Sequence, residues 1–213
     1  MILNLFDILP SSQAKFTAVF LFLLLSCNSL FSQDEINFGE FSSRYSITTT
    51  LINSELEFGN ILQSQGTKEA DIDEAAVIEI EGIKYLDIIL DIAIDSPMQI
   101  DGCSQQSCTM QFTLKASYSN SGETSEISAL NKTKFIGQRT VDFTNKTGLL
   151  TTQFPILERG SAPPGPPPTP DFKGRNLEAE KESVFIFLYG SITASNNDVG
   201  SYASNITVSI NYD

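Results

Sequence analysis

An alternation of apolar and polar residues with a period of two is the strongest constraint on how this chain can fold. It runs from Leu86 to Ile94, from Met110 to Tyr118, and along the C-terminal stretch, which is Gly200–Asp213. Successive side chains of a β-strand point to opposite faces, so each stretch predicts a half-buried antiparallel strand. The even positions of the C-terminal stretch form its more apolar face, namely Tyr202, Ser204, Ile206, Val208, Ile210 and Tyr212.

Two further segments predict strands in distinctive positions. Ala76–Glu81 leads through Gly82 into Ile83–Asp95, which predicts a β-hairpin. Val184–Tyr189 is apolar on both faces, which predicts a central and fully buried strand. The other expected strands are shorter or less regular, namely Tyr45–Ile52, Leu56–Phe58, Phe135–Ile136, Val141–Phe143 and Leu149–Phe154.

These strands together predict the fold class. We expect polar loops at Gln63–Glu74 and Ser119–Lys132, and no segment beyond the N-terminus has a sustained helical period. About nine short strands that share one core predict an all-β fold, and we expect an antiparallel, immunoglobulin-like β-sandwich.

The N-terminus predicts export from the cell. Phe16–Leu25 is an apolar core preceded by Lys15, and it is too short for a membrane span, so residues 1–32 are expected to be a signal peptide cleaved after Ser32. Leu30–Gln33 resembles the signal-peptide ends of Bacteroidetes-type bacteria. A competing interpretation is a lipoprotein signal that places a lipid on Cys27. The expected location is the periplasm, outer surface or extracellular medium of a Gram-negative, Bacteroidetes-like bacterium.

Residues 33–213 are expected to form a single domain that contains a Pro-rich loop at 160–171. The loop cannot enter a sheet or helix, and only two expected strands follow it, too few for a second domain. The two cysteines of this domain, Cys103 and Cys108, are expected to form a disulfide in an oxidising compartment. Closing so short a loop stabilises the fold by about 2 kcal/mol in the chain-entropy model.

Composition excludes several classes of function. The formal net charge of −13 opposes binding to nucleic acid and to anionic membranes. The only membrane link that we expect is through the export signal or the lipid on Cys27. The chain has no His, the commonest general base and zinc ligand. We find no catalytic or phosphate-binding motif, so we expect a non-enzymatic protein without cofactor or metal.

Two groups of carboxylates are candidates for a metal site or a catalytic site. The cluster Glu69, Asp71, Asp73 and Glu74 lacks the spacing of an EF-hand calcium loop, so we interpret it as a solvated turn. Asp87, Asp91 and Asp95 share one strand face, but successive members lie roughly 13 Å apart, too far for acid–base partners. Neither grouping predicts a catalytic site.

Three segments carry a family resemblance, namely Leu56–Ile61, Leu188–Ile192 and Gly200–Tyr212. Through them the chain resembles a bacterial secreted family known as domain of unknown function 4402. Its C-terminal strand is similar to that of chaperone–usher pilins and of spore-coat-protein-U-like domains. In pilins this strand faces a chaperone, and a strand from the next subunit's N-terminal arm completes the sandwich.

The resemblance implies a role for the C-terminal strand. Residues expected to pair with a partner strand, from another copy or from a chaperone-like protein, are Gly200, Ile206, Val208, Ile210 and Tyr212. The corresponding arm, Gln33–Ser43, departs from the pilin pattern because only Ile36 and Phe38 alternate in it. We therefore expect a cell-surface or fimbria-like structural or adhesive subunit. The alternative is a self-complete, monomeric binding module for glycan or protein.

Overall fold

A computed structural model describes residues 46–143, 148–160 and 181–213. All of them belong to the second of two units into which the chain divides, Ser42–Asp213. The expected signal peptide at 1–32, the arm Gln33–Ser43 and residues 161–171 of the Pro-rich loop lie outside the described residues.

The described residues form eleven strands, one short α-helix and two 3-10 turns. Every strand pairing is antiparallel, which confirms the expected all-β, antiparallel class. The elements are β1 Thr48–Asn53, β2 Gly66–Ala70, η2 Ile72–Glu74, β3 Ala76–Ile83, β4 Asp87–Ile94, β5 Met98–Ile100, η3 Gln106–Cys108, β6 Thr109–Ser119, α3 Glu126–Leu130, β7 Lys134–Thr140, β8 Gly148–Pro155, β9 Lys181–Ala194, β10 Tyr202–Ala203 and β11 Ile206–Tyr212.

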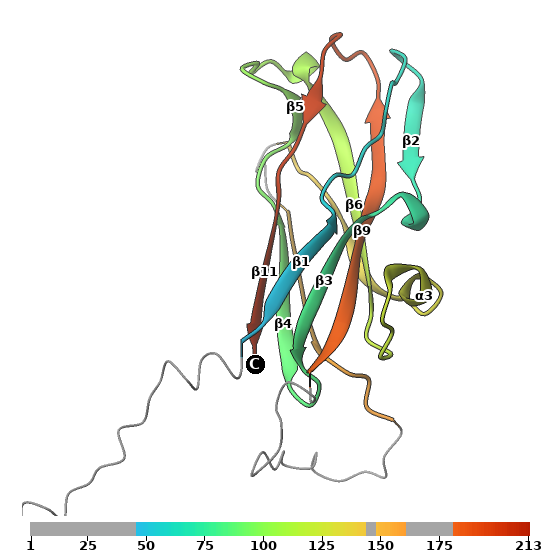
Figure 1. The fold of residues 1–213 in the computed structure, drawn as a ribbon. Coiled ribbons are helices and arrows are strands. Elements are labelled where there is room, and N and C mark those ends of the chain that lie inside the picture. Colours follow the sequence, from blue (N-terminus) through green and yellow to red (C-terminus); the bar gives the residue numbers. More distant parts are fainter. Residues whose placement is uncertain (1–45, 144–147, 161–180) are drawn as a thin grey trace, which may run out of the picture. The chain divides into compact units, whose positions relative to one another are not determined.

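The strands divide between two sheets (Figure 1). The larger sheet is curled and has the order β1-β3-β9-β6-β5-β10, with β2 also paired to β9 and β7 also paired to β6. The smaller sheet has three strands in the order β11-β4-β8. Strand β9 lies at the centre of the larger sheet because β3 and β2 follow one of its edges and β6 follows the other.

The main core lies between the two sheets. The four even residues of β4, from Ile88 to Ile94, are at most 1 % exposed and share one apolar cluster with Phe112 of β6 and Ile186 of β9. Fully burying one such side chain contributes about 1.5–3 kcal/mol. The alternation in the sequence therefore identified the inward faces of β4 and β6 correctly.

A second apolar cluster covers the outer face of the larger sheet. Phe185 and Phe187 of β9 pack there with Val77 of β3 and with Ala129 of α3. Even residues of β9, such as Ile186, face the main core instead. Strand β9 is apolar on both faces because each face has a cover, which confirms the predicted central, buried strand.

The predicted hairpin between β3 and β4 is wrong. Strand β3 pairs with β1 and β9 in the larger sheet, whereas β4 pairs with β11 and β8 in the smaller one. The chain turns at Lys84–Leu86 and crosses from one sheet to the other. Each of the two strands has an apolar face that must be buried. Two strands that face each other across the core bury these faces as well as two paired strands do.

Several other sequence predictions need correction. Leu56–Phe58 is no strand, although Phe58 is buried in the main core, and Val141–Phe143 is no strand either. The expected loop at Gln63–Glu74 contains β2 and η2. The expected loop at Ser119–Lys132 contains α3, whose N-terminus is capped by the Ser125 side chain accepting from the Ser128 N–H.

The C-terminal stretch is two strands and not one. Strand β10 pairs with β5 of the larger sheet, whereas β11 pairs with β4 of the smaller sheet. The switch occurs at Ser204–Asn205, where the Ser204 hydroxyl donates to the Ser96 carbonyl at 2.7 Å and the Asn205 carbonyl accepts from the Asp95 N–H at 3.0 Å. The alternation continues through the switch, so the sequence pattern conceals it.

Gly190 in the middle of β9 provides a test of this packing. A Cβ atom there would lie 2.1 Å from the Thr113 carbonyl oxygen of β6. We expect Gly190→Ala to lower the free energy of unfolding by about 3 kcal/mol or more, because a backbone atom cannot move aside as a side chain can. Urea unfolding followed by circular dichroism measures this.

The matched control is Gly137→Ala in β7, where the nearest atom to the added Cβ is a Leu150 side-chain carbon at 3.3 Å. The free energy of unfolding of this variant should stay within about 1 kcal/mol of that of the unchanged protein. Equal stability of the two variants would show that β9 and β6 do not approach as closely as described here.

Candidate functional site

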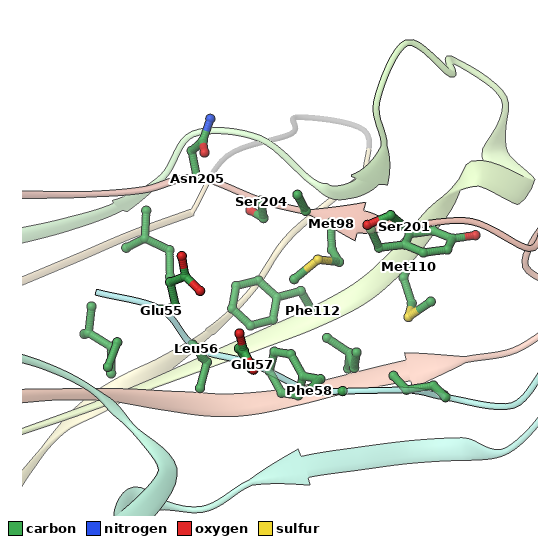
Figure 2. Close-up of a pocket in the computed structure, with 18 of the residues that line it drawn as sticks. Glu55, Leu56, Glu57, Phe58, Met98, Met110, Phe112, Ser201, Ser204 and Asn205 are labelled. Carbon is green, nitrogen blue, oxygen red and sulfur yellow. The ribbon is translucent and has the colours of Figure 1, made fainter. Parts of the chain in front are cut away.

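An open groove of about 1490 Å³ runs between the edges of the two sheets. One wall consists of β1 and the following segment 54–63, and the other consists of residues 197–208 with Ile210. Main-core side chains form the floor, among them Ile78, Met98, Met110, Phe112 and Leu188. Figure 2 shows Phe58 of the first wall close to Phe112, and their ring centroids lie 6.0 Å apart.

One backbone edge of β11 faces this groove and has no partner strand in the part of the chain that the structure describes. Its pairing with β4 matches Thr207 to Ala93 and Ser209 to Asp91. Backbone bonds at both ends of the ladder, from Asp95 N–H to Asn205 O and from Asp213 N–H to Asp87 O, fall on odd-numbered residues of β11. Because bonded and non-bonded pairs alternate in an antiparallel ladder, the N–H and C=O groups of the even residues point away from β4.

The side chains along the groove are incompletely covered. The even residues of β11 are only half-buried, although their partners on β4 are fully buried. On the opposite wall, Leu51 pairs with the buried Ile78 and shares its inward face, yet Leu51 remains 63 % exposed. Among the described residues, no strand pairs with the second edge of β1 or of β11. At this seam the inward-facing side chains of β1 and β11 are therefore not covered by another described strand.

The opposite seam between the sheets is closed. There β7 of the larger sheet lies against β8 of the smaller one, and the Arg139 guanidinium donates to the Leu149 carbonyl at 2.8 Å. Gly137 of β7 also lies close to the Leu150 side chain. The opening between β1 and β11 is therefore a local feature and not a general separation of the sheets.

Four of the five residues predicted to pair with a partner lie along the groove, namely Gly200, Ile206, Val208 and Ile210. Gly200 also has a role within the chain, because a Cβ atom there would lie 2.5 Å from the Ile100 side chain. The prediction did not foresee that these residues belong to two sheets. Strand β11 pairs along its full length within its own chain, as the self-complete alternative expects.

Tyr212, the fifth predicted residue, lies beyond the groove and joins the two sheets. Its hydroxyl oxygen accepts a hydrogen bond from the Ile83 N–H of β3 at 2.9 Å, while its backbone belongs to β11. Burial raises the pKa of the Tyr212 hydroxyl, and the bond from Ile83 opposes that shift. Tyr212 thus has a structural contact that accounts for it without a partner.

The disulfide supports the far end of the groove. Cys103 and Cys108 are bonded as predicted, with their Cα atoms 6.0 Å apart. Within this loop the Ser107 hydroxyl donates to the Asp198 carboxylate at 2.7 Å, and the Ser107 carbonyl accepts from the Asp198 N–H at 2.8 Å. Asp198 and the neighbouring Tyr202 both line the groove, so the disulfide loop holds part of its wall.

The groove is acidic at its rim. Its lining includes Glu55, Glu57, Asp95 and Asp198 but neither lysine nor arginine. Figure 2 shows the carboxylates of Glu55 and Glu57 pointing from their segment toward the opposite wall. No ion pair among the described residues involves these two glutamates. Within the described part of the chain, the negative charge of these two glutamates is therefore uncompensated.

Sequence reasoning missed one whole wall of this site. Glu55–Phe58 was interpreted as a strand, but it is an unpaired extended segment whose apolar residues enter the core while its glutamates face the groove. Met98 of the floor was not singled out, and Met110 was predicted only as the start of an alternating strand. The alternation at Glu55–Phe58 was visible, but the sequence does not indicate that its polar face borders a second sheet.

The other carboxylate groupings have separate partners. Asp87 pairs with Arg159 at 2.6 Å, Asp91 accepts from the Thr151 hydroxyl at 2.6 Å, and Asp95 accepts from the Thr207 hydroxyl. In the acidic turn, Glu69 pairs with Lys115 at 3.3 Å. Among the described residues, no three acidic or sulfur ligands gather as a metal site, and no helix is long and apolar enough to cross a membrane.

Neither models of known protein families nor curated proteins match this chain. The groove, its charge and the two strand edges that have no partner among the described residues are therefore the features that point to a function.

The raised pKa of Tyr212 gives a prediction about stability and pH. An unfolded tyrosine loses its proton near pH 10, whereas the folded one retains it, so the unfolded state binds fewer protons above that pH. The stability contributed by neutral Tyr212 is fully present below pH 10 and is lost as the pH rises further. At pH 8 we expect Tyr212→Phe to cost about 1 kcal/mol, because the Ile83 N–H loses its acceptor.

The stability gap between Tyr212→Phe and the unchanged protein should then narrow between pH 10 and pH 11. Urea unfolding at a series of pH values measures it. Tyr85→Phe is the control, because Tyr85 is exposed whereas Tyr212 is half-buried. A gap that stays constant over this range would contradict the assignment.

Proposed function

We propose that this protein is an exported, non-enzymatic structural or adhesive subunit of a bacterial cell-surface assembly. A partner protein holds it by adding an extended strand to the groove between β1 and β11. One observation carries the proposal: within residues 46–143, 148–160 and 181–213, two neighbouring strand edges have no partner strand, and the inward faces of both sheets are incompletely covered there. Strand addition supplies backbone hydrogen bonds to an edge and fills such pockets with alternate side chains.

The composition of both edges supports this proposal. Proteins protect exposed strand edges with charged residues, proline or bulges, because an unpaired edge recruits other chains. Strand β7, at the closed seam, contains Lys134 and Arg139. Strands β1 and β11 contain no charged residue and no proline, although β1 has a bulge near Asn53. Edges of this composition favour pairing.

The finer fold assignment and the setting belong to the same proposal. An immunoglobulin-like sandwich that lacks a closing strand accounts for two sheets that are joined along one seam and open along the other. Export fits the disulfide, which persists in oxidising compartments. The resemblance to the domain of unknown function 4402 and to the C-terminal strand of pilins agrees with a surface subunit.

A self-complete, monomeric binding module is the second candidate. It is favoured by β11, which pairs with β4 over all seven of its residues within its own chain. In that case the groove binds a ligand that does not extend the sheet. The two candidates differ in whether the free backbone edge of β11 takes part in binding.

Proline substitutions on β11 separate these candidates. The Val208 N–H points to the groove, so Val208→Pro should leave the β4–β11 ladder intact, and proline is tolerated on an edge strand at such positions. We expect the free energy of unfolding of this variant to lie within about 1 kcal/mol of that of the unchanged protein. We expect it to bind its partner about tenfold more weakly, because one backbone hydrogen bond to the added strand is lost. Size exclusion of complexes extracted from the envelope of the native bacterium measures the association.

Ser209→Pro is the matched control because the Ser209 N–H points to β4. This variant should lower the free energy of unfolding by about 2 kcal/mol. Assembly that survives in Val208→Pro, or a protein that is monomeric in every envelope fraction, would reject strand addition and leave the binding module.

A further inference from the structure

We infer that the groove receives a strand from a different protein, with large apolar residues at alternate positions and lysine or arginine between them. This inference rests on the proposed function and specifies the partner of the same site. It differs from assembly by identical copies, because the arm of this chain does not have the required pattern.

The free edge of β11 fixes the spacing of the incoming strand. Three residues of β11 direct both their backbone groups and their side chains toward the groove, namely Ile206, Val208 and Ile210. Residues that pair directly across a ladder share a face, so the residues opposite these three must also point inward. The partner therefore needs at least three inward residues at every second position, within about seven residues that span roughly 23 Å.

The inward positions require apolar side chains. The groove floor is built from apolar residues of the main core, including Met98, Met110, Phe112 and Leu188. An ionised side chain placed against this floor would lose its hydration without gaining a partner. Methionine side chains adapt to irregular shapes, so several large apolar residues fit here.

The outward positions favour positive charge. A partner strand would lie between the wall that carries Glu55 and Glu57 and the wall that carries Asp198, where Asp95 also contacts Thr207. Asp95 and Asp198 accept hydrogen bonds from Thr207 and Ser107, but the two glutamates have no ion pair among the described residues. The Lys68 ammonium donates a hydrogen bond to the Asn60 carbonyl at 3.4 Å. Lys68 lies beside the groove and is not among the residues that line it. Lysine or arginine between the inward residues would compensate this rim.

The arm of this chain fails both requirements. Within Gln33–Ser43, Ile36 and Phe38 match two inward positions, but the next alternate residue is Glu40. The arm also contains Asp34 and Glu35 and has no lysine or arginine. Its three negative charges meet an acidic rim on a chain whose formal net charge is −13. A second copy of the chain is therefore a poor occupant of the groove.

Binding of three synthetic peptides tests the inference. The basic peptide has nine residues with isoleucine or valine at alternate positions and lysine or threonine between them. The acidic peptide has glutamate in place of lysine, and the third peptide has the sequence of Gln33–Arg44. The protein is expressed with its leader and recovered from the exported fraction, and fluorescence anisotropy measures each dissociation constant at low and at physiological salt.

We expect the basic peptide to bind at least tenfold more tightly than the other two, and to weaken as salt rises. Glu55→Gln with Glu57→Gln should weaken it about fivefold. Asp73→Asn with Glu74→Gln, which removes two charges from η2 outside the groove, should have no effect. Deleting Gln33–Ser43 should leave the affinity for the basic peptide unchanged.

Four results would overturn the inference. Equal binding of all peptides, abolished by Val208→Pro, would preserve strand addition but reject the basic partner. Tight binding of the Gln33–Arg44 peptide would identify a second copy as the occupant. Basic-peptide binding that is insensitive to Val208→Pro and to the glutamate changes would place it outside the groove. If no peptide binds and the envelope protein is monomeric, strand addition itself fails.

Discussion

The backbone ladder between β11 and β4 is the interaction on which the functional part of this fold depends. It fixes which residues of β11 face the core and which backbone groups remain free. The ladder is bonded through the odd residues, so the even residues present both an apolar side chain and an unpaired backbone to the groove. A register shifted by one residue would turn the polar residues inward and remove the site.

The larger sheet supplies the rigid support for this edge. Strand β9 is paired on both sides and covered on both faces, so the groove floor rests on the most deeply buried strand of the described part. Phe185 and Phe187 are held under α3, while Ile186 and Leu188 face the main core. The groove is thus an opening at the side of an otherwise complete core, and its floor is already formed before any partner arrives.

Period-two patterns predicted which residues face inward, but not which strands are neighbours. The inward residues of β4, β6 and β11 and the central place of β9 followed from alternation and apolar content. The false hairpin between β3 and β4 arose because both a paired and a facing arrangement bury the same residues. The break at Ser204–Asn205 was missed because alternation continues when a chain changes sheets. A five-residue helix such as α3 is too short to display a helical period.

The candidate site was only partly predictable, for a related reason. The resemblance singled out the residues of β11 that line the groove, and the cysteine count predicted the disulfide, since both signals are local. The opposite wall and the floor come from segments distant in sequence, with Glu55 and Phe112 as examples. An unpaired edge is also a property of the whole topology, because any strand sequence can be central or peripheral. Only the pairing of all the strands reveals which edges remain free.

The strong negative charge and the open seam have to be considered together. An uncovered apolar groove with unguarded strand edges would normally promote association between identical copies. A formal net charge of −13 opposes that association, because every encounter between copies brings like charges together. In the proposed assembly, the same charge would attract a basic partner to the groove and speed its binding. The negative charge would then have two effects, because it keeps identical copies apart and favours a basic partner.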